Sequence, residues 1–310
     1  QPAHWSRRID CLPETTAVLC ADWGIHPEAF IEVMPPLAGF VGSDLLAGVF
    51  ASRLLEKGPG TLLIDFGTNS EVALWDGGSL WVTSAAGGPA FEGCGVGCGT
   101  PAEPGAIYRV RLSGRTSAQF ADDIEFLTID DEKPRGLCGS GIVDLIACLL
   151  KSGRLTSIGR FSPGISDGRI VILNGDTLSL QLTKRDVDIF QRAKAAIFAA
   201  VRVLLSKASM SPKELRHLYV GGVFGHFLDR ESAAAVGLLP DLSGDAVELC
   251  GNTALRGCEE LLMSSGSAEV VEGLRGRAKL VNLAQCGEFD DFFLEGLYLA
   301  RWADPNVSRC

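Results

Sequence analysis

The sequence predicts an α/β fold built around a mixed β-sheet. At residues 136–150, 217–236 and 246–264, an apolar strand with glycines at its end is followed by a helical pattern. Strands that alternate with helices in this way are typical of α/β domains. Three further apolar runs, 61–66, 70–76 and 79–85, are separated only by short turns and predict an antiparallel meander. Together the two patterns predict a sheet with both parallel and antiparallel neighbours.

The composition is that of an ordinary globular protein of one or two lobes. The chain has 310 residues, 46% of them hydrophobic and 21% charged, and its formal net charge is −10. Binding to a nucleic-acid backbone needs clustered lysine and arginine, and no basic run occurs, so nucleic acid is not an expected partner. No apolar stretch reaches the length of a membrane span, and the first residues lack the apolar core of a signal peptide. We therefore expect a cytoplasmic protein without a membrane partner.

The first predicted helix precedes the meander. Ser43-Asp44 supply its predicted N-cap, and apolar residues recur at helical spacing up to Leu54. Gly58-Pro59-Gly60 ends this helix and is the clearest boundary in the first third of the chain.

A glycine-rich segment, residues 85–105, follows the meander. It contains seven glycines between Gly87 and Gly105, so it is too rich in glycine for regular structure and too apolar for a linker. We predict a loop packed at a site, within reach of the turn after Asp65, that changes order when a ligand or a partner binds.

Two local signals organise the middle of the chain. Asn174-Gly175 predicts a turn between two short strands. Thr183 and Asp186 predict a capping box for a long amphipathic helix that reaches about Ser209.

The turn between the first two strands of the meander carries Asp65, Gly67, Thr68 and Asn69. Consecutive backbone N–H groups in such a turn can bind a phosphate, and a carboxylate at a strand end can hold the water shell of Mg²⁺. The alternative is an ordinary β-turn, because asparagine and glycine dominate turns in general.

Two further glycine clusters are candidate ligand sites. The run Gly-Gly-Val-Phe-Gly at residues 221–225 follows an apolar strand, at the end where open α/β sheets bind ligands, although its spacing is not that of a dinucleotide motif. Close packing of strand and helix is the alternative. The run Gly-Ser-Gly at residues 139–141 precedes a helix, whose free N–H groups favour an anion, with an N-cap by Ser140 as the alternative.

The cysteines and histidines do not indicate a metal centre. Among ten cysteines, Cys94 and Cys98 form the only close pair, and small buried apolar residues are favoured over a metal site. The four histidines are scattered, so no zinc site or catalytic triad is indicated.

The order of these motifs is more specific than any single one. Strand–Asp-x-Gly-Thr–strand, a glycine-led helix, and strand–Gly-Gly-x-x-Gly–helix resemble the second lobe of the superfamily of acetate and sugar kinases, heat-shock ATPases and actin. The blocks "PPLAGFVGSD", "LLIDFGTNSEVAL", "SAAGGPAFEGCGVGCG", "GLCGSGIVDLIACLL" and "YVGGVFGHFLD" resemble the carboxyl-terminal region of the ATP-dependent reductive activators of corrinoid proteins. The resemblance runs from about Ile25 to about Asn252.

The resemblance implies an α/β fold of the actin-like (ribonuclease H-like) kind, with an ATPase lobe over residues 59–310 and the end of a preceding lobe over residues 1–58. It implies ATP and Mg²⁺ as cofactors, a corrinoid protein as partner, a homodimer as one possible assembly, and ATP hydrolysis that drives the reduction of cob(II)alamin to cob(I)alamin. Family members carry an amino-terminal plant-type [2Fe–2S] domain as electron donor. This chain lacks that cysteine spacing and has one Asp-x-Gly-Thr hairpin where the superfamily has two, so we expect the [2Fe–2S] domain and the first hairpin upstream of Gln1.

The implied site combines the motifs above. Asp65 would be catalytic and hold Mg²⁺ through water, and Glu92 would orient a water at the γ-phosphate or contact the partner; pairing with an arginine, or exposure to water, is the alternative for Glu92. The residues expected to bind the nucleotide are Gly67, Thr68, Asn69, Gly139, Ser140, Gly141, Gly221, Gly222 and Gly225. The glycine turns at 67, 221 and 251 should then converge on one edge of the sheet.

Two other functions stay open. The lobe could be a binding module that docks a corrinoid protein through the segment 86–105 without chemistry of its own. It could also be a phosphotransferase to a small carboxylate or sugar, because fold does not fix function.

Overall fold

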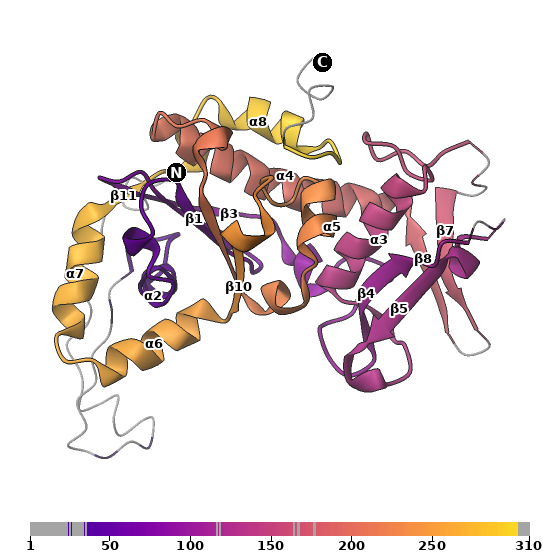
Figure 1. The fold of residues 1–310 in the computed structure, drawn as a ribbon, viewed down its shortest axis with the longest axis horizontal. Coiled ribbons are helices and arrows are strands. Elements are labelled where there is room, and N and C mark those ends of the chain that lie inside the picture. The colour runs from indigo at the N-terminus through magenta and orange to yellow at the C-terminus, as the bar shows by residue number, and fades with distance from the viewer. Residues whose placement is uncertain are drawn as a thin grey trace.

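The computed structural model describes Gly24, His26, Met34 and residues 36–302, apart from 116, 118, 164, 166, 167, 176 and 177. Strands form the centre of the fold, with α4 and α8 on one side of the main sheet and α2, α6 and α7 on the other (Figure 1). The helices are α2 (Ser43–Ala51), α3 (Gly139–Lys151), α4 (Lys184–Lys207), α5 (Arg230–Ala235), α6 (Thr253–Met263), α7 (Ser267–Arg277) and α8 (Phe289–Gly296).

The main sheet is mixed, as the sequence predicts. Its order is β10-β9-β1-β2-β3-β11. β1, β2 and β3 form the antiparallel meander, whereas β9 runs parallel to both β1 and β10, and β11 runs parallel to β3. The strands are β1 (Thr61–Asp65), β2 (Ser70–Trp75), β3 (Leu80–Ala85), β9 (His217–Gly221), β10 (Val247–Gly251) and β11 (Ala278–Leu280).

The sheet is buried on both faces, which explains why its strands are nearly continuous apolar runs. Side chains alternate between the faces, so Leu62 and Ile64 of β1 join a core shared with α4, while Leu63 joins a core shared with α2. The sheet therefore positions whatever follows the ends of β1, β9 and β10.

A second region is inserted between β3 and β9. It contains a three-stranded sheet, in the order β5-β4-β6, and a β-hairpin formed by β7 and β8. α3 packs on β4, and α4 returns the chain to the main sheet. The strands are β4 (Ala106–Leu112), β5 (Ile124–Thr128), β6 (Gly136–Leu137), β7 (Arg169–Asn174) and β8 (Ser179–Thr183).

Local signals set the start of α4. Thr183 is its N-cap, and the capping box with Asp186 is present as predicted. The helix ends at Lys207, close to the predicted end.

The prediction for the first helix is wrong at both ends. Gly42 is the N-cap of α2 and no side chain caps it, because Oδ1 of Asp44 accepts the N–H of Leu45 instead, at 2.9 Å. α2 ends at Ala51, and the left-handed φ of 53° at Arg53 separates it from a 3₁₀ turn over Leu54–Glu56. That residues 1–58 are the end of a preceding lobe stays a prediction; most of 1–35 lies outside the described residues.

Within the described part of the chain, no helix combines the length and the apolar character needed to cross a membrane.

Candidate functional site

The glycine turns after β1, β9 and β10 meet at one edge of the main sheet, as predicted. Asp65 pairs with Gly221 in the parallel register of β1 and β9, and Gly251 pairs with Gly221 in that of β10 and β9. The N–H of Phe66 donates to the carbonyl of Gly221 at 3.2 Å, and the N–H of Gly222 donates to the carbonyl of Gly251 at 2.8 Å. The carboxyl ends of three adjacent strands therefore form one continuous edge.

Gly221 and Gly222 are required by this convergence. A Cβ on Gly221 would lie 2.8 Å from Oγ1 of Thr253 and 3.0 Å from Oδ1 of Asp65. Gly222 has a φ of +86°, and a Cβ there would lie 2.2 Å from the carbonyl oxygen of Phe66. Close packing thus accounts for both glycines, and their place beside a nucleotide stays a prediction.

On one side of the edge, Asp65 lies in an acidic cluster with Glu71 and Asp44. Its Oδ2 accepts the hydroxyl of Thr253 at 3.2 Å, and Glu71 stands directly opposite it on β2. Burial, and secondarily the charge of Asp44, raise the pKa of Asp65 to about 6 against the hydrogen bond from Thr253. Burial and the charges of Asp44 and Asp65 raise the pKa of Glu71 to about 7, although Ser84 donates to it at 3.0 Å.

Nowhere among the described residues do three or more His, Cys, Asp or Glu side chains form a group able to hold a metal ion. A hydrated Mg²⁺ requires only one or two carboxylates, because it keeps several of its waters. Asp65 as a ligand through water is compatible with this geometry and stays a prediction.

On the other side of the edge lies an aromatic pocket. Phe66 contacts Phe91 and Phe224, with ring centroids 5.8 and 5.0 Å away, and Phe91 lies 5.2 Å from Phe224. The pocket has a volume of about 350 Å³. Its walls are Phe66, Gly67, Phe91, Glu92, Pro101, Ala102, Glu103, Cys138, Gly139, Ser140, Phe224 and Phe227.

The glycine-rich segment reaches the turn after β1, as predicted. The hydroxyl of Thr68 donates to Oε1 of Glu92 at 2.9 Å, and the N–H of Gly88 donates to the carbonyl of Thr68 at 3.0 Å. Pro89–Glu92 form a short 3₁₀ helix, and the N–H of Gly97 donates to Oδ1 of Asp186 at 2.7 Å. The segment is therefore fixed both to the turn and to the start of α4.

The start of α3 forms a wall of the pocket, but its cap differs from the predicted alternative. Cys138, not Ser140, is the N-cap, and no side chain caps the helix. The hydroxyl of Ser140 donates to the carbonyl of Tyr108 at 3.0 Å. A Cβ on Gly139 would lie 2.0 Å from the carbonyl oxygen of Phe91, so this glycine allows α3 to approach the glycine-rich segment.

The remaining predicted residues fall into three groups. Gly67, Glu92, Gly139 and Ser140 line the pocket, and Thr68 contacts Glu92. Asp65 lies on the other side of the edge. Gly141 and Gly225 are buried, while Asn69 is exposed and does not line the pocket.

The two cysteines of the glycine-rich segment differ from each other. Cys98 is buried, and burial followed by the charge of Asp186 raises its pKa to about 12, so it behaves as a small apolar residue. Cys94 is exposed, so the prediction that both are buried is wrong for this residue.

The aromatic wall and the acidic neighbours of Asp65 were not predicted from the sequence. Phe66 and Phe224 each precede a glycine that was predicted to bind nucleotide, and this position was the available signal for the aromatic wall. An apolar residue at such a position is equally typical of a hydrophobic core. Thr253 begins α6 directly after the turn at Gly251 and is completely buried, so its position in the third strand–glycine–helix unit was a usable signal.

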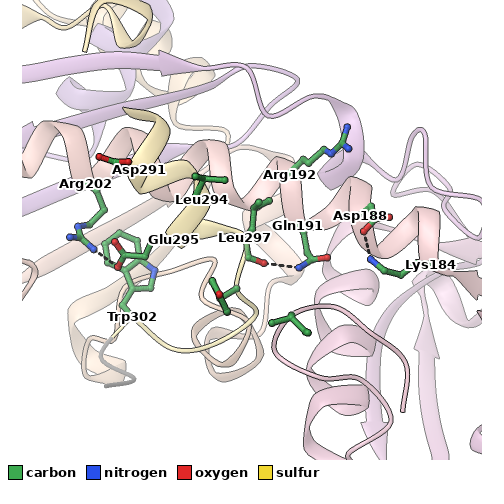
Figure 2. A pocket seen from close by; sticks show the side chains of 12 residues that line it. Lys184, Asp188, Gln191, Arg192, Arg202, Asp291, Leu294, Glu295, Leu297 and Trp302 are labelled. Carbon is green, nitrogen blue, oxygen red and sulfur yellow. Dashed lines mark hydrogen bonds and ion pairs between the residues drawn. The ribbon is translucent and has the colours of Figure 1, made fainter. Parts of the chain in front are cut away.

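A larger hollow lies away from this edge. It measures about 990 Å³ and is bounded by α4, α8, the residues after α8 and Ile158, which follows α3 (Figure 2). Figure 2 shows Arg202 paired with Glu295 and Lys184 paired with Asp188 along its length. None of the predicted site residues lines it.

The strand order, the antiparallel meander beside parallel strands and the insertion before β9 define an actin-like ASKHA domain, as predicted. The family model described as the C-terminal domain of RACo, the ASKHA domain, matches residues 60–307. The chain belongs to this family, which confirms the resemblance to reductive activators of corrinoid proteins.

Relatives and a solved structure agree with this assignment. The corrinoid activation enzyme RamQ of Eubacterium limosum is 30% identical over 290 residues, 87% of this chain and 47% of the relative. The [Co(II) methylated amine-specific corrinoid protein] reductase of Methanosarcina barkeri is 28% identical over 281 residues, 85% of this chain and 50% of the relative. A solved reductive activator for corrinoid, iron–sulfur protein superposes with a TM-score of 0.81 at 29% identity, covering 91% of this chain and 46% of that one. The chain thus spans about half the length of the curated relatives it matches.

Proposed function

We propose that this chain is the nucleotide-binding lobe of an ATP-dependent reductive activator of a corrinoid protein. ATP binding and hydrolysis at the edge formed by β1, β9 and β10 would drive a one-electron reduction of cob(II)alamin to cob(I)alamin on the partner. The electron would come from a [2Fe–2S] cluster outside these residues, which is oxidised by one electron in the same step.

The observation that carries the proposal is the pairing of Asp65 with Gly221 at the ends of the parallel strands β1 and β9. Ligands of open α/β sheets bind at the carboxyl ends of the strands, and here three such ends meet in a domain of the ASKHA family. The turn from Gly67 to Asn69 would face the β- and γ-phosphates. Gly221 and Gly222 would lie by the adenosine, with the aromatic pocket beside them.

The acidic cluster of Asp44, Asp65 and Glu71 supports the proposal that a divalent cation binds at this edge. Burial raises the pKa values of Asp65 and Glu71, and the nearby charge of Asp44 adds to both shifts. A hydrated Mg²⁺ carried by ATP would supply the missing positive charge and neutralise the phosphate oxygens. Asp65 would hold its water shell.

The corrinoid partner is supported by the relatives. Two proteins similar to most of this chain are named for corrinoid activation and for reduction of a corrinoid protein. Because both are about twice as long as the matching region, the reduction itself requires more than the lobe described here.

A Mg²⁺-dependent ATPase assay on the full-length gene product, with and without a cob(II)alamin-bearing partner, tests the proposal. We expect the partner to stimulate turnover and the absorption spectrum of cob(I)alamin to appear only when ATP is present. Constant turnover with a small carboxylate or sugar as acceptor would instead establish a phosphotransferase. Partner binding without any turnover would establish a binding module.

A further inference from the structure

One guanidinium group connects two walls of the aromatic pocket. Arg109 lies on β4, in the inserted region, and its Nη1 is 3.2 Å from Oδ2 of Asp144 and 3.2 Å from Oδ2 of Asp229. Its Nη2 donates to the carbonyl of Phe227 at 3.1 Å. A single side chain thus binds one group on α3 and two groups in the segment 224–229 that leads into α5.

The elements that it joins are the ones that shape the pocket. Asp144 belongs to α3, whose first residues Gly139 and Ser140 line one wall. Phe227 lines another wall, within the segment that follows the Gly-Gly turn of β9. Asp229 is the N-cap of α5 and accepts the N–H of Ser232 at 2.9 Å, which anchors this segment.

The neighbouring residue strengthens the same bridge. The ring of Tyr108 lies 4.9 Å from that of Phe227, and the carbonyl of Tyr108 accepts the hydroxyl of Ser140. β4 therefore contacts both walls through two consecutive residues.

The charges explain why an arginine stands here. The side chain of Asp144 is 1% exposed, and burial raises its pKa against the N–H of Val110 and the charge of Arg109. A buried carboxylate needs its countercharge, and only the planar guanidinium offers several donors in fixed directions. A lysine would keep the charge but could not reach Asp144, Asp229 and the carbonyl of Phe227 together.

We propose that Arg109 is a positioning residue that sets the distance between the start of α3 and the segment 224–229, and so the affinity of the pocket for nucleotide. The inference rests on the proposed function. It adds a residue, outside every glycine motif, through which the inserted region controls the nucleotide site.

The chain offers a matched control for the obvious variant. Arg154 pairs with Asp123 at 2.8 Å, and the side chain of Asp123 is 2% exposed. Arg154 also donates to the carbonyl of Ser117 at 2.9 Å and lies over the ring of Phe120. This ion pair belongs to the same inserted region and does not line the pocket.

The experiment compares Arg109→Lys with Arg154→Lys in the full-length gene product. Isothermal titration with Mg-ATP and thermal unfolding are measured for both. We expect both variants to lose similar thermal stability, but only Arg109→Lys to weaken Mg-ATP binding, by about tenfold. If the affinities of the two variants agree within about twofold, Arg109 is structural and the inference is wrong.

Hydrogen exchange separates this inference from the proposed function. If the wild-type protein binds no nucleotide, the proposed function fails. The positioning role of Arg109 is then tested by hydrogen exchange alone. Arg109→Lys must raise exchange at both 139–144 and 224–229, whereas Arg154→Lys must not. Unchanged exchange at either segment would overturn the positioning role of Arg109 itself.

Discussion

The hydroxyl of Thr68 donates a hydrogen bond of 2.9 Å to the carboxylate of Glu92, which joins the turn after β1 to the glycine-rich segment. Both residues are exposed, and Glu92 also lines the aromatic pocket. Glu92 is therefore bound to the turn that is proposed to face the phosphates, and it does not pair with an arginine in the described structure.

Glu92→Gln tests whether this carboxylate acts in hydrolysis. Glutamine can still accept the hydroxyl of Thr68, so the turn should keep its geometry and only the charge is lost. We expect kcat for ATP hydrolysis to fall by about 100-fold with little change in KM, as for loss of a general base. Glu103→Gln is the control, because Glu103 lines the same pocket without contacting Thr68. Equal kcat values for both variants would exclude the catalytic role.

Asp65→Asn tests the assignment of the cation. Asparagine keeps an acceptor for Thr253 but removes the charge that would hold hydrated Mg²⁺. We expect Mg-ATP to bind about tenfold more weakly, while ATP with excess EDTA binds as it does to the wild type. Asp76→Asn, in the turn at the other end of β2, is the control and should change neither constant. Tight Mg-ATP binding by the Asp65 variant would refute the assignment.

The sequence predicted those parts of the fold that local patterns determine. The meander, the strand–glycine–helix units and the capping box of Thr183 depend on residues close together in the chain. The end of α2 was mispredicted because the left-handed backbone at Arg53 interrupts a sequence that remains apolar at helical spacing up to Leu54.

The site was only partly predictable for a different reason. Gly67, Glu92 and Gly139 were found through motifs, but the aromatic wall exists only after Phe66, Phe91 and Phe224 are brought together from distant segments. The same holds for Arg109, which has no motif around it and whose proposed role depends on its contacts with Asp144 and Asp229.

Gly222→Ala should be much more destabilising than Gly88→Ala. Both glycines have positive φ with extended ψ, so alanine is strained at either position. A Cβ at Gly88 meets nothing within 4 Å, whereas one at Gly222 would lie 2.2 Å from the carbonyl oxygen of Phe66. We expect the free energy of unfolding to fall by about 2 kcal/mol more for Gly222→Ala, measured by urea denaturation. Equal losses of stability in the two variants would mean that the backbone at this edge of the sheet can shift to accommodate the added Cβ.

Lys194 should make stability depend on alkaline pH. It is buried in α4, where its ammonium group donates to the carbonyl of Tyr298, and burial lowers its pKa to about 7 against the charge of Glu295. Because this pKa is lower in the folded than in the unfolded chain, where it is near 10.5, stability is lost as pH falls toward 7 and is gained as pH rises.

Denaturation at pH 7 and pH 9 measures this effect. We expect the free energy of unfolding of the wild type to rise by about 1–3 kcal/mol relative to that of Lys194→Met. Lys207→Met, which removes an exposed partner of Glu288, is the control and should keep the dependence of the wild type. Parallel curves for wild type and Lys194→Met would show that Lys194 stays charged when buried.

Nucleotide binding should change exchange in one part of the glycine-rich segment and not in another. Residues 88–92 are held to the turn after β1 by the bonds from Gly88 to Thr68 and from Thr68 to Glu92. Residues 97–99 are held independently, since Gly97 donates to Asp186 in the capping box of α4. A phosphate at the turn would compete for Thr68 and so alter only the first attachment.

Hydrogen exchange of the full-length gene product with and without Mg-ATP should therefore differ at 88–92 and agree at 97–99. Identical exchange at 88–92 in both states would show that the segment is scaffold, and that nucleotide, if bound, does not act through Thr68.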